Sequence, residues 1–269
     1  MSHSRTTVHG TIVGVIVLDT GFRRLAGDIA HAATWPFPVQ FRIVHGVRPR
    51  DVIEGDPRHS LDAFRAAIDD LVALGCTAIT TSCGFLAALQ GELTLHSPVP
   101  FLSSALLQIP MIEHILPAGK KPGLILSDPH SITERHLHAV GAAPGLPMAA
   151  LPVDGPLLRN MREQATEVDA AAQEADVMAT VAELMAHHSE VGALVFECAN
   201  LPPTRQLCRG GSGSRSLISS HWYAGCSYRW RRRIISNERP LRIARHRWWP
   251  DRLGDCLGSG AERCTGYAS

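Results

Sequence analysis

Two cysteines stand in short polar segments that each follow a predicted strand. Cys83 lies in Thr81-Ser82-Cys83-Gly84, and Cys198 lies in Glu197-Cys198-Ala199-Asn200. A thiol with an ordinary pKa of about 8.5 can be brought toward neutrality by a helix N-terminus or by hydrogen-bond donors, and can then act in acid/base catalysis. Racemisation at a carbon alpha to a carbonyl removes a proton from one face and delivers one to the other. Two such groups on opposite walls of one pocket would suit that reaction.

The groups around these cysteines can bind a substrate carboxylate or its enolate-like intermediate. The hydroxyls of Thr81 and Ser82 and the backbone N–H groups at Gly84 and after Cys198 are suitable donors. Asp19, at the end of the first predicted strand, can bind an amino group, orient Cys83 or cap a turn. The predicted substrate-binding residues are Asp19, Thr20, Thr81, Ser82, Gly84, Ala199 and Asn200.

The chain lacks the residues that several other common types of catalysis require. The chain has only two lysines, Lys120 and Lys121, and neither has the context of a Walker A loop or of a separate Schiff-base lysine. No G-x-G-x-x-G follows a strand. His187-His188 and His136/His138 lie on predicted helices without an i, i+4 pair, so no metal site is expected. Cys76 reads as a buried small hydrophobe. We therefore expect neither a cofactor nor a metal.

Alternating strands and helices over residues 11–200 would position these cysteines. Such alternation predicts α/β architecture, with parallel sheets covered by helices on both faces. Open parallel sheets place ligands outside the carboxyl ends of their strands, where both cysteines are expected. The predicted strands are 11–18, 40–44, 78–81, 123–127 and 193–196, and the predicted helices are 60–74, from about 85, 105–116, 131–140 and 168–188.

The two halves of this region have a similar sequence pattern. A strand ending in Asp19 precedes Cys83, and a strand ending in Ser127-Asp128 precedes Cys198 at a similar separation. Each half therefore reads as one α/β lobe with a cysteine just past a strand. Two lobes facing each other would bring the cysteines to opposite sides of one cleft.

The motifs around Cys83 and Cys198, together with Asp19-Thr20-Gly21, resemble the aspartate/glutamate/hydantoin racemase superfamily over about residues 11–203. The resemblance implies two similar α/β lobes and a cofactor-independent racemase or isomerase. It also implies that Cys83 and Cys198 are the two acid/base groups and that Asp19 is the aspartate of the family's D-S/T-G turn. A small carboxylate or a hydantoin-like compound would be the substrate.

The second motif departs from that of the glutamate racemases, which have Gly-Cys-Thr-His. No histidine follows Cys198, and an inward-pointing Glu197 would raise the thiol pKa, so glutamate is a doubtful substrate. A related decarboxylase branch lacks the first cysteine, whereas this chain has Cys83. Maleate cis–trans isomerases also use two cysteines and remain an alternative. So does a catalytically impaired homologue that only binds small carboxylates.

The charge and the amino-acid composition of the chain change just after Pro203. Residues 1–203 carry 11 arginines and 2 lysines against 21 acidic residues, whereas residues 204–269 carry 13 arginines against 4. The latter segment also holds four of the five tryptophans and no clear periodicity. A nucleic-acid-binding tail is one interpretation. We prefer a frameshift near Pro203, because a shifted reading can give an apolar strand-like string after a Gly-Leu-Pro turn. On this interpretation the tail is disordered or out of frame and impairs activity.

The predicted organisation is a first lobe at 1–116, a second lobe at 117–203 and an atypical Arg/Trp-rich tail at 204–269. The chain has 269 residues, 45% of them hydrophobic, and a formal net charge of +1. It has no run of 18 apolar residues and no signal-peptide pattern, and its seven cysteines do not suggest a disulfide framework. A cytoplasmic enzyme is expected, with no nucleic-acid or membrane partner and with a homo-oligomer left open.

Overall fold

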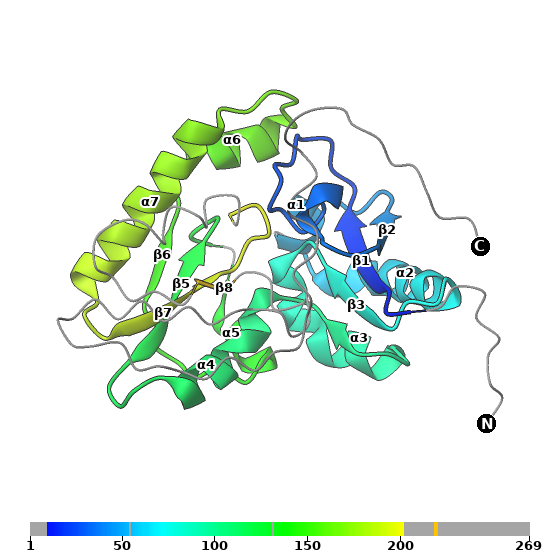
Figure 1. The fold of residues 1–269 in the computed structure, drawn as a ribbon, viewed down its shortest axis with the longest axis horizontal. Helices are drawn as coiled ribbons and strands as arrows, with labels where there is room; N and C mark the ends of the chain where they lie inside the picture. Colours follow the sequence, from blue (N-terminus) through cyan, green and yellow to red (C-terminus); the bar gives the residue numbers. More distant parts are fainter. Residues whose placement is uncertain (1–9, 54, 131, 202–217, 220–269) are drawn as a thin grey trace, which may run out of the picture. The chain divides into compact units, whose positions relative to one another are not determined.

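The computed structural model describes residues 10–53, 55–130, 132–201 and 218–219 (Figure 1). The chain divides into two compact units, Met1–Arg229 and Trp230–Ser269. The second unit lies entirely outside the described residues, so the fold below is that of the first. The predictions for the tail at 204–269 also lie outside the described residues, apart from Ile218 and Ser219.

The first sheet has four parallel strands in the order β2-β1-β3-β4. Its central strand β1 is buried at all six positions, as its continuous apolar sequence predicts for a strand covered on both faces. The strands are β1 (Val13–Leu18), β2 (Val39–Val44), β3 (Ala78–Thr81) and β4 (Phe101–Leu102).

The second sheet repeats this arrangement in the order β6-β5-β7-β8, again with parallel strands. In both sheets the strand that comes first along the chain lies between the second and the third. The predicted α/β class with two similar lobes is therefore confirmed. The strands are β5 (Lys121–Leu126), β6 (Met148–Ala150), β7 (Val191–Phe196) and β8 (Ile218–Ser219).

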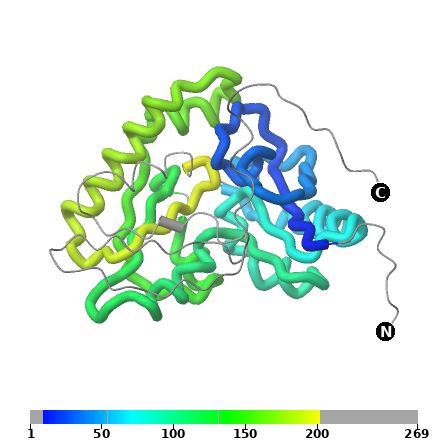
Figure 2. Tube along the Cα trace, in the orientation of Figure 1, coloured from blue at the N-terminus to red at the C-terminus, as the bar shows by residue number. Residues whose placement is uncertain are grey.

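Helices flank both sheets, as the tube trace in Figure 2 also shows. In the first lobe α2 contacts β1 and β2, and in the second α7 contacts β5 and β6. The α-helices are α1 (Pro49–Ile53), α2 (Leu61–Ala73), α3 (Gln90–His96), α4 (Ile109–Ile115), α5 (Glu134–Ala139), α6 (Pro156–Glu163) and α7 (Ala170–His187). Short 3-10 helices are η1 (Ala32–Thr34), η2 (Pro57–Ser60), η3 (Gly84–Leu89) and η4 (Ala105–Gln108).

Three local predictions need correction. The segment after Cys83 begins with the 3-10 helix η3 before α3 follows at Gln90. The sequence Ser131-Ile-Thr-Glu134 has the spacing of a capping box, but the observed box at α5 is made by Thr133 and His136, two residues further along. Ser60 is a suitable N-cap residue by type, and it precedes α2, but its side chain makes no capping hydrogen bond.

The largest apolar core includes side chains from both sheets. Ile16 and Ile79 of the first sheet belong to the same cluster of buried residues as Leu124 and Val195 of the second. Because this cluster extends across both lobes, the loops at the carboxyl ends of β3 and β7 are held within one packed structure.

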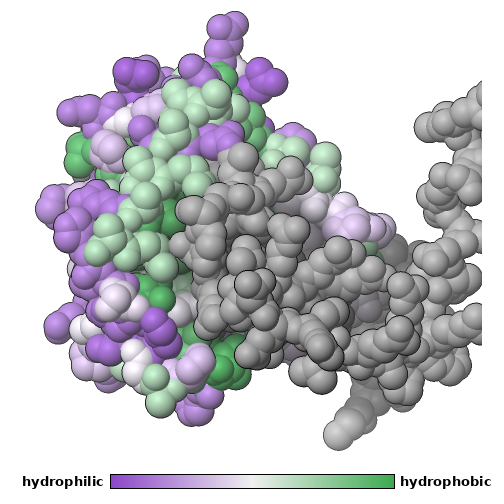
Figure 3. All heavy atoms as spheres, turned by 60° about the vertical axis from the view of Figure 1, so that its left-hand side comes forward, coloured by the Kyte–Doolittle hydropathy of each residue, from purple (hydrophilic) through white to green (hydrophobic). Residues whose placement is uncertain are grey.

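The face on the α7 side of the molecule is mixed in character. Figure 3, which brings this side forward, shows pale green apolar residues among purple hydrophilic ones. No helix within the described residues is long and apolar enough to cross a membrane.

Ile218–Ser219 extends the second sheet within a segment for which the sequence predicts no regular element. It pairs in parallel with β7, Ile218 opposite Leu194 and Ser219 opposite Val195. The predicted boundaries at 116 and 203 stay predictions.

Candidate active site

Cys83 lies two residues after the end of β3 and directly precedes η3, with only 5% of its surface exposed. Thr81 holds the turn: its Oγ1 accepts from the Cys83 N–H at 3.2 Å and donates to the Ser103 carbonyl oxygen at 2.8 Å. The Phe85 and Leu86 N–H groups also make hydrogen bonds to the Cys83 thiol. Thr81 therefore positions Cys83. The neighbouring Ser82 Oγ is buried and has no hydrogen-bond partner among the described residues.

Cys198 occupies the corresponding place two residues after the end of β7, and 6% of it is exposed. Its Sγ donates to Asn200 Oδ1 at 3.4 Å. The backbone N–H of Asn200 and the side chain of Ser127, which follows β5, also make hydrogen bonds to the thiol. The loop after β7 and the loop after β5 therefore both reach this sulfur.

Glu197 lies between the two cysteine loops, with 3% of its surface exposed. Its Oε2 accepts from Ser127 Oγ at 3.2 Å and from Ser127 N–H at 3.4 Å. Its Oε1 is buried and has no hydrogen-bond partner among the described residues. A Cβ added to Gly84 would lie 2.6 Å from the Glu197 carbonyl oxygen and closer still to Oε1. Because Gly84, the residue after Cys83, has no side chain, Glu197 of the second lobe can pack directly against its backbone.

Burial dominates the ionisation of this cluster. It raises the pKa of the Cys83 thiol to about 12, and the nearby Glu197 charge adds to the increase. The pKa of Cys198 is also raised, first by burial, then by Glu197 and further by Asp28. The predicted effect of Glu197 on the Cys198 pKa is thus confirmed. The expected lowering of the thiol pKa is wrong, because loss of water outweighs the local donors.

Burial also raises the pKa of the Glu197 carboxyl group, to about 7. The two hydrogen bonds from Ser127 act in the opposite direction, and the charge of Asp128 adds to the increase. The ionisation of Glu197 therefore falls near neutral pH, whereas that of both thiols lies well above it.

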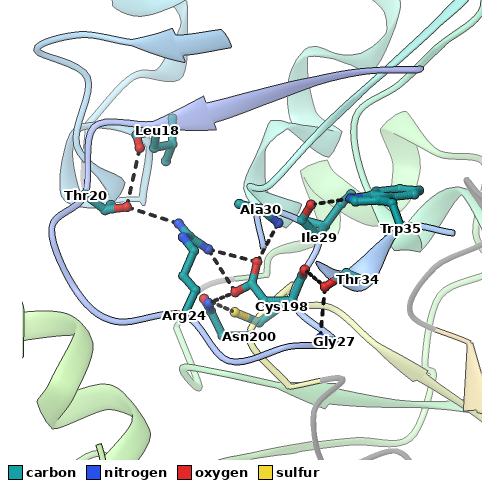
Figure 4. Close-up of polar contacts among 11 residues, drawn as sticks. Leu18, Thr20, Arg24, Gly27, Ile29, Ala30, Thr34, Trp35, Cys198 and Asn200 are labelled. Atoms are coloured by element: carbon teal, nitrogen blue, oxygen red, sulfur yellow. Dashed lines mark hydrogen bonds and ion pairs between the residues drawn. The ribbon is translucent and has the colours of Figure 1, made fainter. Parts of the chain in front are cut away.

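A polar network connects Cys198 to the loop after β1 (Figure 4). Asn200, which accepts from the thiol, donates from Nδ2 to Asp28 Oδ2. Asp28 is 1% exposed and pairs with Arg24 at 2.9 Å. Arg24 also donates to Thr20 Oγ1 at 3.1 Å and lies over the Phe22 ring at 4.6 Å. The first lobe thereby supports the second cysteine motif.

Two small adjoining hollows lie beside this network. Asn200 lines both of them, and Arg24 and Asp28 line the first. Side chains from α6 and α7, including Met161 and Gln173, form the opposite side of the first cavity. A water-sized opening therefore lies next to Asn200, the residue that contacts the Cys198 thiol.

The predicted site residues divide into two groups. Gly84 contacts Glu197, and Cys83 is near enough for the Glu197 charge to raise its pKa. Ala199 packs against the first lobe's apolar cluster of Val15, Val17, Ile29 and Trp35. Asp19 instead is exposed and accepts from the Gly46 N–H at 2.9 Å, beyond β2. None of its described hydrogen bonds is with Cys83, so its role toward a substrate stays a prediction.

Sequence reasoning did not identify Arg24, Asp28 or the hydroxyl of Ser127 as part of this site. Ser127 could have been identified from the sequence repeat, because it directly follows β5, the strand that corresponds to β1. Arg24 and Asp28 lie in an irregular loop with no recognisable motif. No cluster of three or more potential metal ligands occurs within the part of the chain that the structure describes.

No known family model matches the chain. Its sequence is similar to a dimethylsulfoniopropionate lyase of Durusdinium sp. clade D, with 24% identity over 211 residues, which cover 75% of this chain and 69% of that protein. It is also similar to dimethylsulfoniopropionate lyase 7 of Emiliania huxleyi, with 32% identity over 101 residues. This match covers 37% of the chain and 30% of that relative.

The structure is also similar to three solved proteins. They are an arylmalonate decarboxylase Gly-to-Cys mutant (15% identity, TM-score 0.48), a glutamate racemase of Bacillus anthracis (14%, 0.46) and the aspartate racemase of Picrophilus torridus (14%, 0.44). The matches cover 78%, 77% and 78% of this chain and 88%, 76% and 89% of the respective structures.

Proposed function

We propose that the protein is a cofactor-independent enzyme that moves a proton at a carbon alpha to a carboxylate or carbonyl, with Cys83 and Cys198 as the acid/base pair. The observation that carries this proposal is the meeting of the two cysteine loops at one buried carboxyl group. Glu197, directly before Cys198, packs against Gly84, directly after Cys83. Two thiols from different lobes thus border the same small region.

In the racemase form of the reaction, the thiolate of one cysteine takes the alpha proton, and the C–H electron pair passes into an enolate-like intermediate. The thiol of the other cysteine then gives its proton to the opposite face of the carbon. The sulfur that was a thiolate becomes a thiol and the other becomes a thiolate, so charge is conserved. Ser82 Oγ, which has no hydrogen-bond partner among the described residues, is suited to donate to the developing oxyanion.

Elimination is a second candidate, favoured by the dimethylsulfoniopropionate lyase relatives. Their substrate is a carboxylate with a sulfonium group on the beta carbon. Removal of its alpha proton by a thiolate would expel neutral dimethyl sulfide and leave acrylate. This reaction shares its first step with racemisation, and then needs a leaving group in place of a second proton donor.

Proton NMR in heavy water tests the proposal and separates its two forms. The probes are aspartate, glutamate, a 5-substituted hydantoin, maleate and dimethylsulfoniopropionate. Racemisation predicts deuterium at the alpha carbon together with loss of optical rotation, and elimination predicts acrylate signals. The proposal is wrong if the wild-type protein binds a probe but catalyses neither alpha exchange nor elimination nor isomerisation on any of them. Such binding alone would indicate a carboxylate-binding protein.

A further inference from the structure

We propose that Glu197 is the proton store of the site: its carboxyl group takes the proton from a cysteine thiol when the thiolate is needed and returns it after turnover. This inference rests on the proposed function and assigns a role to a group that the two-thiol scheme leaves unused. Three features carry it: the path to Cys198, the free oxygen on the side of Cys83, and the burial that isolates the cluster from water.

The path to Cys198 runs through Ser127. Ser127 Oγ donates to Glu197 Oε2 at 3.2 Å, and the same side chain lowers the pKa of the Cys198 thiol. The thiol hydrogen, which is donated to Asn200 Oδ1, must turn to Ser127 Oγ before it can be passed on. A hydroxyl group accepts one proton while it donates another, so it can pass a proton from sulfur to carboxylate without leaving its place. The S–H bond breaks, the carboxyl O–H bond forms, and the negative charge moves from oxygen to sulfur.

The other carboxylate oxygen faces the first cysteine loop. Glu197 Oε1 is the atom nearest to the position of a Cβ on Gly84, the residue after Cys83. This oxygen is buried and has no hydrogen-bond partner among the described residues. A buried polar atom is costly to leave unsatisfied, and a proton or a ligand hydrogen on Oε1 would satisfy it.

A proton store solves a problem set by the burial of both thiols. Both thiols are neutral at neutral pH in this environment, whereas the carboxyl group has a pKa of about 7. After one racemisation the thiolate is on the opposite wall from where it began. Glu197 can return its proton to that thiolate, which restores both thiols and the carboxylate without exchange with solvent.

Charged groups near Glu197, Ser127 and the two cysteines also affect the pKa values of the site. Asp128 raises the pKa of Glu197, Asp28 raises that of Cys198, and Arg24 lowers that of Cys83. Arg24 and Asp28 form an ion pair with each other. The shared proton is therefore held mainly by Glu197 and the two thiols.

Alkylation by iodoacetamide, resolved by peptide mass spectrometry from pH 5 to 10, tests the inference on the intact chain without a substrate. In the wild-type protein, the alkylation rates of Cys83 and Cys198 should rise up to about pH 7, level off while a proton is shared with Glu197, and rise again at higher pH. In Glu197→Gln the plateau should disappear, so that each rate rises about tenfold per pH unit until the thiol titrates.

Ser127→Ala tests the path to Cys198. The plateaus reflect an equilibrium between protonation states, which does not depend on the path of the proton, so both should remain. Alpha-proton exchange should slow, because only the Cys198 path uses the hydroxyl group. Glu183→Gln, at an exposed glutamate on α7, is the matched control and should keep both plateaus. A wild-type profile with a single rise at both cysteines would overturn the proposal, whether or not the variants fold.

A merely electrostatic role for Glu197 gives a similar alkylation profile and is separated from the proton store by alpha-proton exchange. Removing the negative charge would then make the thiols more acidic, and the variant would exchange protons at least as fast as wild type. The proton store predicts loss of exchange in Glu197→Gln. Absence of exchange in the wild-type protein refutes the proposed function alone, because the alkylation profile needs no reaction.

Discussion

Asn200 donates a hydrogen bond from its side-chain nitrogen to the buried carboxylate of Asp28, across 172 positions of sequence. The same amide accepts from the Cys198 thiol. The loop after β1 and the loop after β7 are therefore joined next to a proposed acid/base group. The orientation of Cys198 depends on residues of both lobes.

Replacing Asn200 with alanine should weaken both stability and catalysis. Asp28 would lose one partner inside the protein, and an unsatisfied buried acceptor costs about 1–3 kcal/mol. Urea unfolding measures the loss, and alpha-proton exchange measures the effect on Cys198. Asn160→Ala is the matched control, because Asn160 lines the same cavity from α6. Equal losses in both variants would contradict a specific role for the Asn200–Asp28 bond.

Gly84→Ala should destabilise the protein, because the new methyl group would lie 2.6 Å from the Glu197 carbonyl oxygen. Overpacking of this kind costs about 1–3 kcal/mol, so the melting temperature should fall by several degrees. Gly91→Ala is the control: Gly91 lies in α3, and an added Cβ there meets no atom within 4 Å. Its melting temperature should be unchanged or higher. A Gly84→Ala protein as stable as wild type would show that the two loops do not approach closely.

Stability should depend on pH through Glu197. Its carboxyl pKa rises from 4.5 to about 7 in the folded protein, so between these values the folded state holds a proton that the unfolded state has lost. The free energy of unfolding must then decrease as pH rises, by up to about 1.4 kcal/mol per unit, and level off above about pH 7.

Subtracting the unfolding free energy of Glu197→Gln at each pH isolates this contribution from that of Asp28, whose pKa burial also raises. Urea titrations at pH 5, 6, 7 and 8 provide the values. A difference between wild type and variant that stays constant over this range would mean that Glu197 has an ordinary pKa.

The sequence predicted the elements that carry the site but not the contacts within it. Apolar runs identified β1, β3, β5 and β7, and the polar motifs placed Cys83 and Cys198 correctly just past two of these strands. The buried Asp28–Asn200 contact could not be predicted, because it joins an irregular loop to a distant motif without any periodic pattern.

The thiol pKa was predicted in the wrong direction for a related reason. The donors near Cys83 are local in sequence, whereas the burial that outweighs them comes from the packing of both lobes. Asp19 shows the same limit. Its place after β1 was correctly predicted, but its partner, the N–H of Gly46, follows a different strand.

The central claim is that Cys83 and Cys198 exchange protons with the same carbon atom from opposite sides. Its most direct test is deuterium incorporation and change of configuration, followed together in heavy water on the best probe for wild type, Cys83→Ala, Cys198→Ala and the control Cys76→Ala. We expect each site variant to lose interconversion by about 100-fold or more, while one of them can still exchange the proton on a single face. Cys76→Ala should remain active, since Cys76 is a core residue. Interconversion at near wild-type rate in either Cys83→Ala or Cys198→Ala would contradict the two-thiol mechanism.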